Sequence, residues 1–159
     1  CAINPAGFQW FDLNTDDPEY ILNESKKAES KILKYIEEIK FEYKLQNSNI
    51  CISGFSQGCM MAINIALTAK ERFNSIVGFS GKIINKADLL KRMISKPNIL
   101  MIHGDSDTVV PPNNLLEAKD FLYRNKIEVE TLIIKNCDHH IPIEASSAAL
   151  NFIKKNFNY

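Results

Sequence analysis

Ser56 is the residue whose setting in this sequence most clearly suggests covalent chemistry. It stands in the middle of Gly54-Phe55-Ser56-Gln57-Gly58, which matches the pattern G-x-S-x-G. Between a strand and a helix, this pattern forms a nucleophile elbow, a sharp turn that leaves the serine hydroxyl exposed. Its two glycines are expected to let the strand and helix backbones approach closely. The same segment also fits a plain turn with a capping serine, so other residues must decide.

A serine hydroxyl becomes a good nucleophile only beside a general base, and that base needs an orienting carboxylate. Suitable residues follow Ser56 in two clusters, His103-Gly104-Asp105-Ser106-Asp107 and Asp138-His139-His140. Taken singly, the aspartates fit an Asx turn and the histidines fit a solvated loop. Each cluster, however, comes directly after a predicted strand, in the order nucleophile, acid, base. Type, order and placement together predict a serine hydrolase.

The elements that must position these residues alternate between strand and helix. An amphipathic helix is expected over 23–43, because apolar residues recur there at spacings of three and four. The remaining expected elements are strand 50–52, helix 57–70, strand 75–79, helix 86–94, strand 98–102, helix 111–125, strand 128–134 and helix 143–157. This alternation predicts one α/β domain over residues 1–159, with a mostly parallel sheet and helices on both faces. The predicted active residues then meet at the carboxyl ends of the strands.

The composition limits the partners. The 159 residues carry 19 basic and 19 acidic side chains, so no nucleic-acid partner is expected. No apolar stretch is long enough to cross a membrane, and no cluster of ligands indicates a metal; no organic cofactor is expected either. A small, nearly neutral substrate fits best. The oligomeric state is left open, with a homodimer as one option.

The four cysteines show neither a C-x-x-C pair nor zinc-finger spacing, so free thiols in a reducing, cytoplasmic compartment are expected. Cys137 lies close in sequence to His139 and His140, which raises the alternative of a thiol nucleophile. A buried, unreactive thiol is the commoner state and is the interpretation favoured here. The chain begins at Cys1 rather than Met, so targeting is left open.

Three segments resemble the phospholipase/carboxylesterase family of α/β-hydrolases, which includes acyl-protein thioesterases and bacterial carboxylesterases. Residues 9–13, Gln-Trp-Phe-Asp-Leu, resemble the loop before the family's first long helix. Residues 54–58 resemble its G-F-S-Q-G elbow, and residues 103–111 resemble its H-G-x-x-D-x-x-V-P segment. The likeness extends over nearly the whole chain and implies the α/β-hydrolase fold.

The resemblance implies a role for each matching residue. Ser56 is the nucleophile, Asp107 the acid of the triad, and the backbone N–H of Gln57 one oxyanion donor. The family's histidine motif, similar to G-H-x-I, aligns the base with His139, although Asp138 replaces the glycine. His140 is kept as the alternative base. Asp105 is then a turn residue behind the acid.

The resemblance also implies a substrate, an ester or acyl-thioester cleaved through an acyl-enzyme. Trp10 is the first candidate to line the acyl-binding surface. Phe8, Phe79 and the pair Met60-Met61 are weaker candidates, because such residues are more often plain core.

One expected part of the family pattern has no counterpart. An upstream strand and an H-G-x-G segment, which supplies the second oxyanion donor, are not found in this sequence. The chain is therefore expected to represent the C-terminal two-thirds of the fold, with its elbow strand at the sheet edge. It is expected to be poorly active or inactive unless the upstream part is supplied. Two further interpretations stay open: a catalytically impaired remnant, and a serine hydrolase of the dienelactone-hydrolase or peptidase type.

Overall fold

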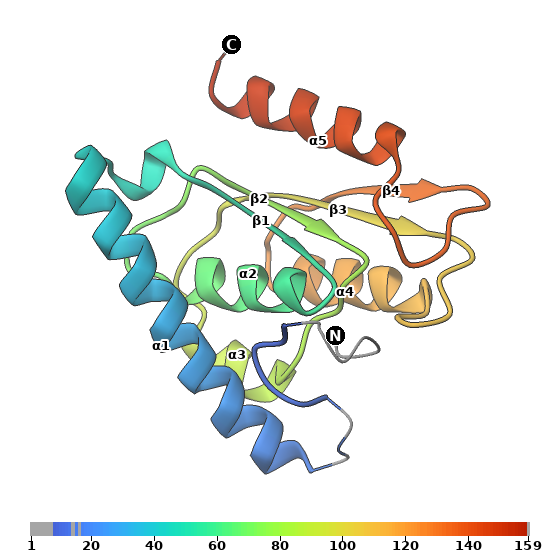
Figure 1. Cartoon of the computed structure of the whole chain (residues 1–159), viewed down its shortest axis with the longest axis horizontal. Coiled ribbons are helices and arrows are strands. Elements are labelled where there is room, and N and C mark those ends of the chain that lie inside the picture. The colour runs from blue at the N-terminus through green and yellow to red at the C-terminus, as the bar shows by residue number, and fades with distance from the viewer. Residues whose placement is uncertain (1–7, 14, 16, 159) are drawn as a thin grey trace.

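The sheet consists of four parallel strands that lie side by side in chain order. The computed structural model describes residues 8–13, 15 and 17–158. Its strands are β1 (Cys51–Phe55), β2 (Ser75–Phe79), β3 (Asn98–Gly104) and β4 (Glu130–Ile134), in the order β1-β2-β3-β4. All three pairings are parallel, so the carboxyl ends of the strands lie along the same side of the sheet (Figure 1). The predicted parallel sheet is confirmed.

Helices cover both faces of this sheet (Figure 1). They are α1 (Pro18–Tyr43), α2 (Gln57–Thr68), α3 (Lys86–Arg92), α4 (Asn113–Arg124) and α5 (Ile143–Asn156). Connections between neighbouring parallel strands are almost always right-handed, and strands that follow each other in one direction therefore carry their crossover helices on one face. Accordingly α2, α3 and α4 lie on the same side as α1, and α5 packs on the other (Figure 1).

Each face of the sheet has its own apolar core. The larger core joins α1–α4 to strand residues such as Ile76 and Met101, and the smaller joins α5 to neighbours of these residues, such as Val77 and Leu100. This alternation follows from the two-residue period of a strand.

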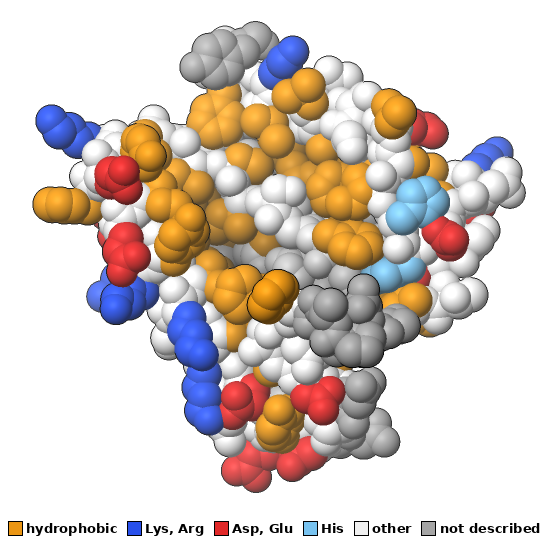
Figure 2. Space-filling model, in the orientation of Figure 1, with side chains coloured by type: hydrophobic (Ala, Val, Ile, Leu, Met, Phe, Trp, Pro, Cys, Tyr) orange, Lys and Arg blue, Asp and Glu red, His pale blue; other side chains and the backbone are white. Residues whose placement is uncertain are grey.

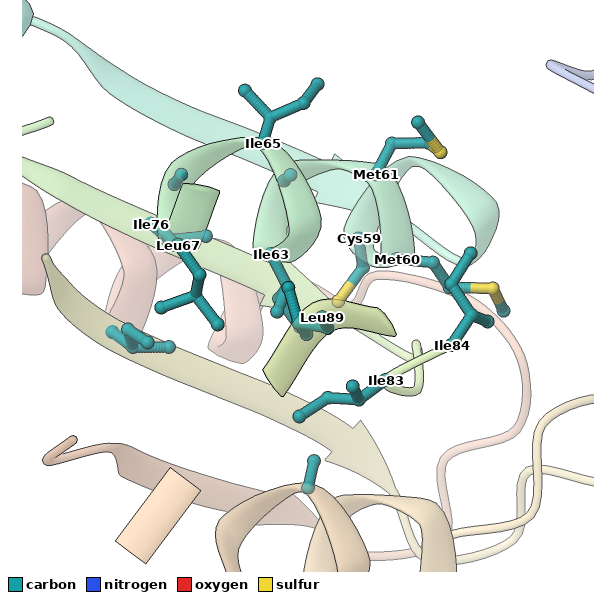
Figure 3. Close-up of a cluster of buried hydrophobic side chains, with 14 of the residues drawn as sticks. Cys59, Met60, Met61, Ile63, Ile65, Leu67, Ile76, Ile83, Ile84 and Leu89 are labelled. Carbon is teal, nitrogen blue, oxygen red and sulfur yellow. The ribbon is translucent and has the colours of Figure 1, made fainter. Parts of the chain in front are cut away.

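The middle of α2 lies within the larger core (Figure 3). Nearly every residue of α2 is buried, as is usual for a helix that is apolar all round. Met60 and Met61 belong to this buried set, so their side chains serve the core.

Several boundaries differ from the sequence-based expectation. Helix α1 begins at Pro18, five residues before the predicted start, because Asp17 caps it: its Oδ1 accepts hydrogen bonds from the backbone N–H groups of Glu19 and Tyr20. Strands β1 and β3 are longer than predicted and include Gly54 and Gly104. Glycine weakens a strand, but here each allows another backbone to approach closely.

Strand β1 forms an edge of the sheet in the described part of the chain, as predicted, since it pairs with β2 alone. Ser53 and Phe55 are exposed on this strand.

Figure 2 shows hydrophobic side chains gathered across the middle of one face of the molecule. Among the helices that the structure describes, none is both long and apolar enough to cross a membrane.

Candidate active site

Ser56 occupies the turn between β1 and α2. Its backbone has φ 53° and ψ −117°, a conformation that costs a non-glycine residue about 1–3 kcal/mol and is seen mainly at functional sites. The Ser56 N–H donates to the carbonyl of Phe79, with an N–O distance of 2.8 Å. This bond continues the β1–β2 ladder and fixes the turn at the carboxyl edge of the sheet.

The two glycines around Ser56 have different roles. A Cβ atom on Gly54 would lie 2.2 Å from the carbonyl oxygen of Gly58, so no side chain fits there without displacing backbone. A Cβ atom on Gly58 would meet no described atom within 4 Å. The expectation that both positions need glycine on steric grounds is therefore correct for Gly54 and wrong for Gly58.

Asp107 lies in the turn after β3, and its side chain is fully buried. Its Oδ1 accepts hydrogen bonds from the backbone N–H groups of Val109 (2.9 Å) and Val110 (2.8 Å). Its Oδ2 lies 2.7 Å from Nδ1 of His139. Burial raises the pKa of Asp107, but the hydrogen bonds from His139 and Val110 outweigh it and hold that pKa below its ordinary value. The carboxyl group is therefore ionised near neutral pH.

The loop after β4 brings His139 to this carboxylate. The N–H groups of Asp105 and Ser106 donate to the carbonyls of Ile134 and Cys137, both at 3.0 Å. Gly104 permits this contact, because a Cβ atom there would lie 2.2 Å from the Cys137 carbonyl oxygen. The acid-bearing and histidine-bearing loops are thus joined through their backbones.

His140 lies apart from Asp107. Its Nδ1 pairs with the carboxylate of Asp138, and both side chains are more than half exposed. The side chain of Asp105 accepts a hydrogen bond from the Ser106 hydroxyl at 2.8 Å. Of the two adjacent histidines, the structure brings His139 to the candidate acid.

Two atoms near the elbow are buried without a partner in the described part of the chain: Oγ of Ser56 and Nε2 of His139. No hydrogen bond joins them to each other there. The ring of His139 packs on Phe55, the residue before Ser56, with the ring centroids 4.7 Å apart. Hydrogen bonds between catalytic groups commonly shorten only when substrate binds.

Gln57 does more than the sequence indicated. It is the first residue of α2, so its backbone N–H has no acceptor within the helix. Its side-chain Oε1 accepts a hydrogen bond from the N–H of Trp10, and its Nε2 donates to the carbonyl of Phe11, both at 2.8 Å. The side chain therefore holds the 10–11 segment against the elbow. The only signal in the sequence was a glutamine directly after the candidate nucleophile.

The candidates for an acyl-binding surface fall into different places. Trp10 is 50% exposed and Phe8 is 97% exposed, whereas Phe79 is buried in the core under α5. Trp10 is tied to the elbow through its backbone, as described above. Phe79 serves the core, like the two methionines of α2.

Cys137 is a poor nucleophile. Burial raises the pKa of its thiol, and the charges of Asp138 and Asp105 raise it further, so the thiolate is scarce near neutral pH. Residues 8–13, 15 and 17–158 contain no group of three or more His, Cys, Asp or Glu residues arranged to hold a metal ion.

Comparison with known proteins identifies the family. The family model described as Phospholipase/Carboxylesterase matches residues 2–157. The chain is 29% identical to acyl-protein thioesterase 1 of Saccharomyces cerevisiae, over 99% of this chain and 71% of the yeast protein. It is 28% identical to acyl-protein thioesterase 1 homolog 1 of Dictyostelium discoideum, over 92% of this chain and 66% of that protein.

Solved structures support the same family and fold. The crystal structure of esterase PE8 superposes with a TM-score of 0.89 at 30% identity, covering 98% of this chain and 73% of PE8. The crystal structure of SOBER1 from Arabidopsis thaliana, at 20% identity and a TM-score of 0.76, covers 92% of this chain and 70% of SOBER1 and shares the fold. The chain is thus a carboxylesterase- or thioesterase-like hydrolase with the α/β-hydrolase fold, and it belongs to the phospholipase/carboxylesterase family.

Proposed function

We propose that this chain cleaves carboxylic esters or thioesters through a Ser56–His139–Asp107 triad and a covalent acyl-enzyme. The observation that carries the proposal is the 2.7 Å contact between Asp107 Oδ2 and His139 Nδ1. That contact leaves Nε2 as the free ring nitrogen of a histidine packed against the elbow. A base in this position is suited to accept a proton from Ser56.

The proposed reaction proceeds in two halves. In the first, His139 Nε2 accepts the Ser56 proton while Oγ attacks the substrate carbonyl, and the backbone N–H of Gln57 donates to the resulting oxyanion. The intermediate collapses, and His139 returns the proton to the departing alcohol or thiol. In the second half, water loses a proton to His139 and attacks the acyl-enzyme, which releases the acid and restores Ser56. Asp107 stays ionised throughout and stabilises the imidazolium.

Trp10 is proposed to contact the acyl group, because Gln57 ties its backbone to the elbow and half of its side chain remains accessible. An aromatic surface next to the nucleophile suits an apolar chain. Relatives named acyl-protein thioesterase favour a thioester, and the relative named esterase favours an oxygen ester.

The domain organisation, the size of the substrate and the cellular location are also proposals. All described strands belong to one sheet that both cores share, which supports a single hydrolase domain. Membership of the esterase family supports a small-molecule substrate. The free thiols of Cys51, Cys59 and Cys137 support a cytoplasmic location.

A second candidate is an impaired hydrolase that binds but turns over slowly. It is favoured by the missing hydrogen bond between Ser56 Oγ and His139 Nε2 within the described residues.

A fluorophosphonate probe tests the proposal without assuming a substrate. The purified chain is labelled, the adduct is located by peptide mass spectrometry, and hydrolysis of p-nitrophenyl acetate and of an acyl-thioester is measured in parallel. We expect one adduct, on Ser56, and none in Ser56→Ala. An adduct without measurable hydrolysis would favour the impaired hydrolase, and an unlabelled Ser56 would refute the activated nucleophile.

A further inference from the structure

His103 is a fully buried histidine that the proposed mechanism leaves unused. It lies near the end of β3, and its side chain is 0% exposed. Its Nε2 lies 2.8 Å from the carbonyl oxygen of Val110 and 3.3 Å from Oδ2 of Asp107. A buried imidazole in contact with the candidate acid requires a physical explanation, because its ring nitrogens must find their hydrogen-bond partners within the protein.

The position of the ring hydrogen follows from the neighbours of each nitrogen. Nε2 faces two oxygen acceptors, whereas Nδ1 is buried with no partner in the described part of the chain. A hydrogen on Nδ1 would be an unsatisfied buried donor and would leave Nε2, a lone pair, facing two oxygens. The hydrogen therefore belongs on Nε2, which donates to the carbonyl of Val110 and lies 3.3 Å from Oδ2 of Asp107.

The ring of His103 lies beside the carboxylate of Asp107, whose two oxygens have other hydrogen-bond partners. A carboxylate offers about four acceptor positions. Oδ1 accepts from the N–H groups of Val109 and Val110, and Oδ2 faces His139 Nδ1 and His103 Nε2. The contact to His139 is shorter by 0.6 Å (3.3 − 2.7), so His139 is the stronger partner. The His103 ring lies in contact with Oδ2, so rotation of the carboxylate toward that ring is blocked.

The same imidazole also holds the turn that carries Asp107. Val110 donates its N–H to Asp107 and accepts at its carbonyl from His103. Because His103 belongs to the rigid β3 strand, the turn is tied to the sheet by a side chain as well as by its backbone. Both contacts fix the direction in which Asp107 meets His139.

We propose that His103 is a positioning residue that holds the Asp107 carboxylate in the plane in which it orients His139. This inference rests on the triad proposed above. His103 acts through Asp107, and it exchanges no proton with the substrate.

Substitutions that keep or remove the Nε2 donor test the proposal through the rate of Ser56 labelling by a fluorophosphonate. The amide nitrogen of His103→Gln reaches the place of Nε2, while that of His103→Asn reaches only the place of Nδ1. We expect His103→Gln to keep most of the rate, and His103→Asn and His103→Phe to lose roughly 10-fold to 100-fold, as small misalignments in active sites do. Ester hydrolysis should show the loss in kcat with little change in KM.

A double-mutant cycle separates positioning from a general structural effect. In an Asp107→Asn background, His103→Asn should cost no further labelling rate, because its route of action is already lost. Equal losses in both backgrounds would overturn the inference, as would wild-type rates in His103→Asn. Failure of the proposed function looks different: wild type and Ser56→Ala would then label alike.

A measurement on the unmodified chain covers the case in which these variants do not fold. The sequence has three histidines, so long-range ¹H–¹⁵N correlation spectra resolve each ring. We expect His103 with its hydrogen on Nε2 and His139 with its hydrogen on Nδ1. A hydrogen on Nδ1 of His103 would overturn the inference.

Discussion

The ring of Phe55 lies against the imidazole of His139, with the centroids 4.7 Å apart and the planes tilted by 41°. Phe55 ends β1 and is followed directly by Ser56. His139 belongs to the loop after β4, the strand at the opposite edge of the four-stranded sheet. The contact therefore bridges the strand that carries the candidate nucleophile and the loop that carries the candidate base.

Replacement of each adjacent histidine should give opposite results. His139→Ala removes the partner of Asp107, and we expect it to reduce ester hydrolysis by at least about 10³. His140→Ala is the matched control, because it removes a half-exposed side chain paired with Asp138, and it should retain activity within about twofold. Initial rates with p-nitrophenyl acetate measure both. Comparable losses in the two variants would contradict the assignment of the base.

The strained backbone of Ser56 should lower the free energy of unfolding, while its hydroxyl should be essential for activity. Ser56→Ala is expected to abolish turnover with little change in the free energy of unfolding. Ser56→Gly should also be inactive but more stable than Ser56→Ala by about 1 kcal/mol, because glycine adopts φ 53° and ψ −117° without strain. Urea unfolding of the two inactive variants measures the difference. A less stable glycine variant would argue against stored strain.

Asp107 should make stability depend on pH in the acid range. Its pKa in the folded state lies below the ordinary value of 3.8, so the folded state binds this proton less readily than the unfolded state does. The contribution is complete above that ordinary value and is lost as pH falls through the lower, folded value.

Asp107→Asn lacks this contribution. The difference in unfolding free energy between wild type and Asp107→Asn should therefore shrink from pH 6 to pH 3. Asp88, whose pKa is also lowered, is present in both proteins and cancels. A pH-independent difference would count against the ionised acid. The variant should also lose at least about 10² in kcat.

The two elbow glycines should respond differently to alanine. Gly54→Ala places a Cβ atom 2.2 Å from the Gly58 carbonyl oxygen, and we expect a loss of about 2 kcal/mol or more in unfolding free energy. Gly58→Ala meets no described atom within 4 Å and lies in a helix, where alanine is favoured by up to about 1 kcal/mol. Thermal unfolding of both variants tests the pair, and equal destabilisation would disagree with the geometry.

The fold was predictable because its signals are local. Strand and helix periods, together with their alternation, are properties of short segments, and they sufficed for the parallel sheet. The family was indicated by the resemblance of residues 9–13, 54–58 and 103–111 to its motifs. The start of α1 was missed although Asp17 and Pro18 form a recognisable cap. Asp and Pro also fit a turn, and the apolar repeat that identifies the helix begins later.

The candidate site was predictable in residue type and order, but its contacts depend on distant parts of the chain. Neither histidine of the 139–140 pair is distinguished locally. The meeting of the Ser106 N–H and the Cys137 carbonyl sets the loop that presents His139 to Asp107. The clamp between Gln57 and Trp10 joins residues 47 positions apart, and no sequence period reports such a contact.

The backbone junction between Gly104 and Cys137 also determines how the site comes apart. Asp105 and Ser106 donate across it, so the turn that holds Asp107 cannot open without freeing the loop that holds His139. In hydrogen–deuterium exchange, these two amides should lose protection together, as one cooperative unit of local unfolding. The candidate acid Asp107 and the candidate base His139 are then expected to lose their native positions in the same local unfolding event.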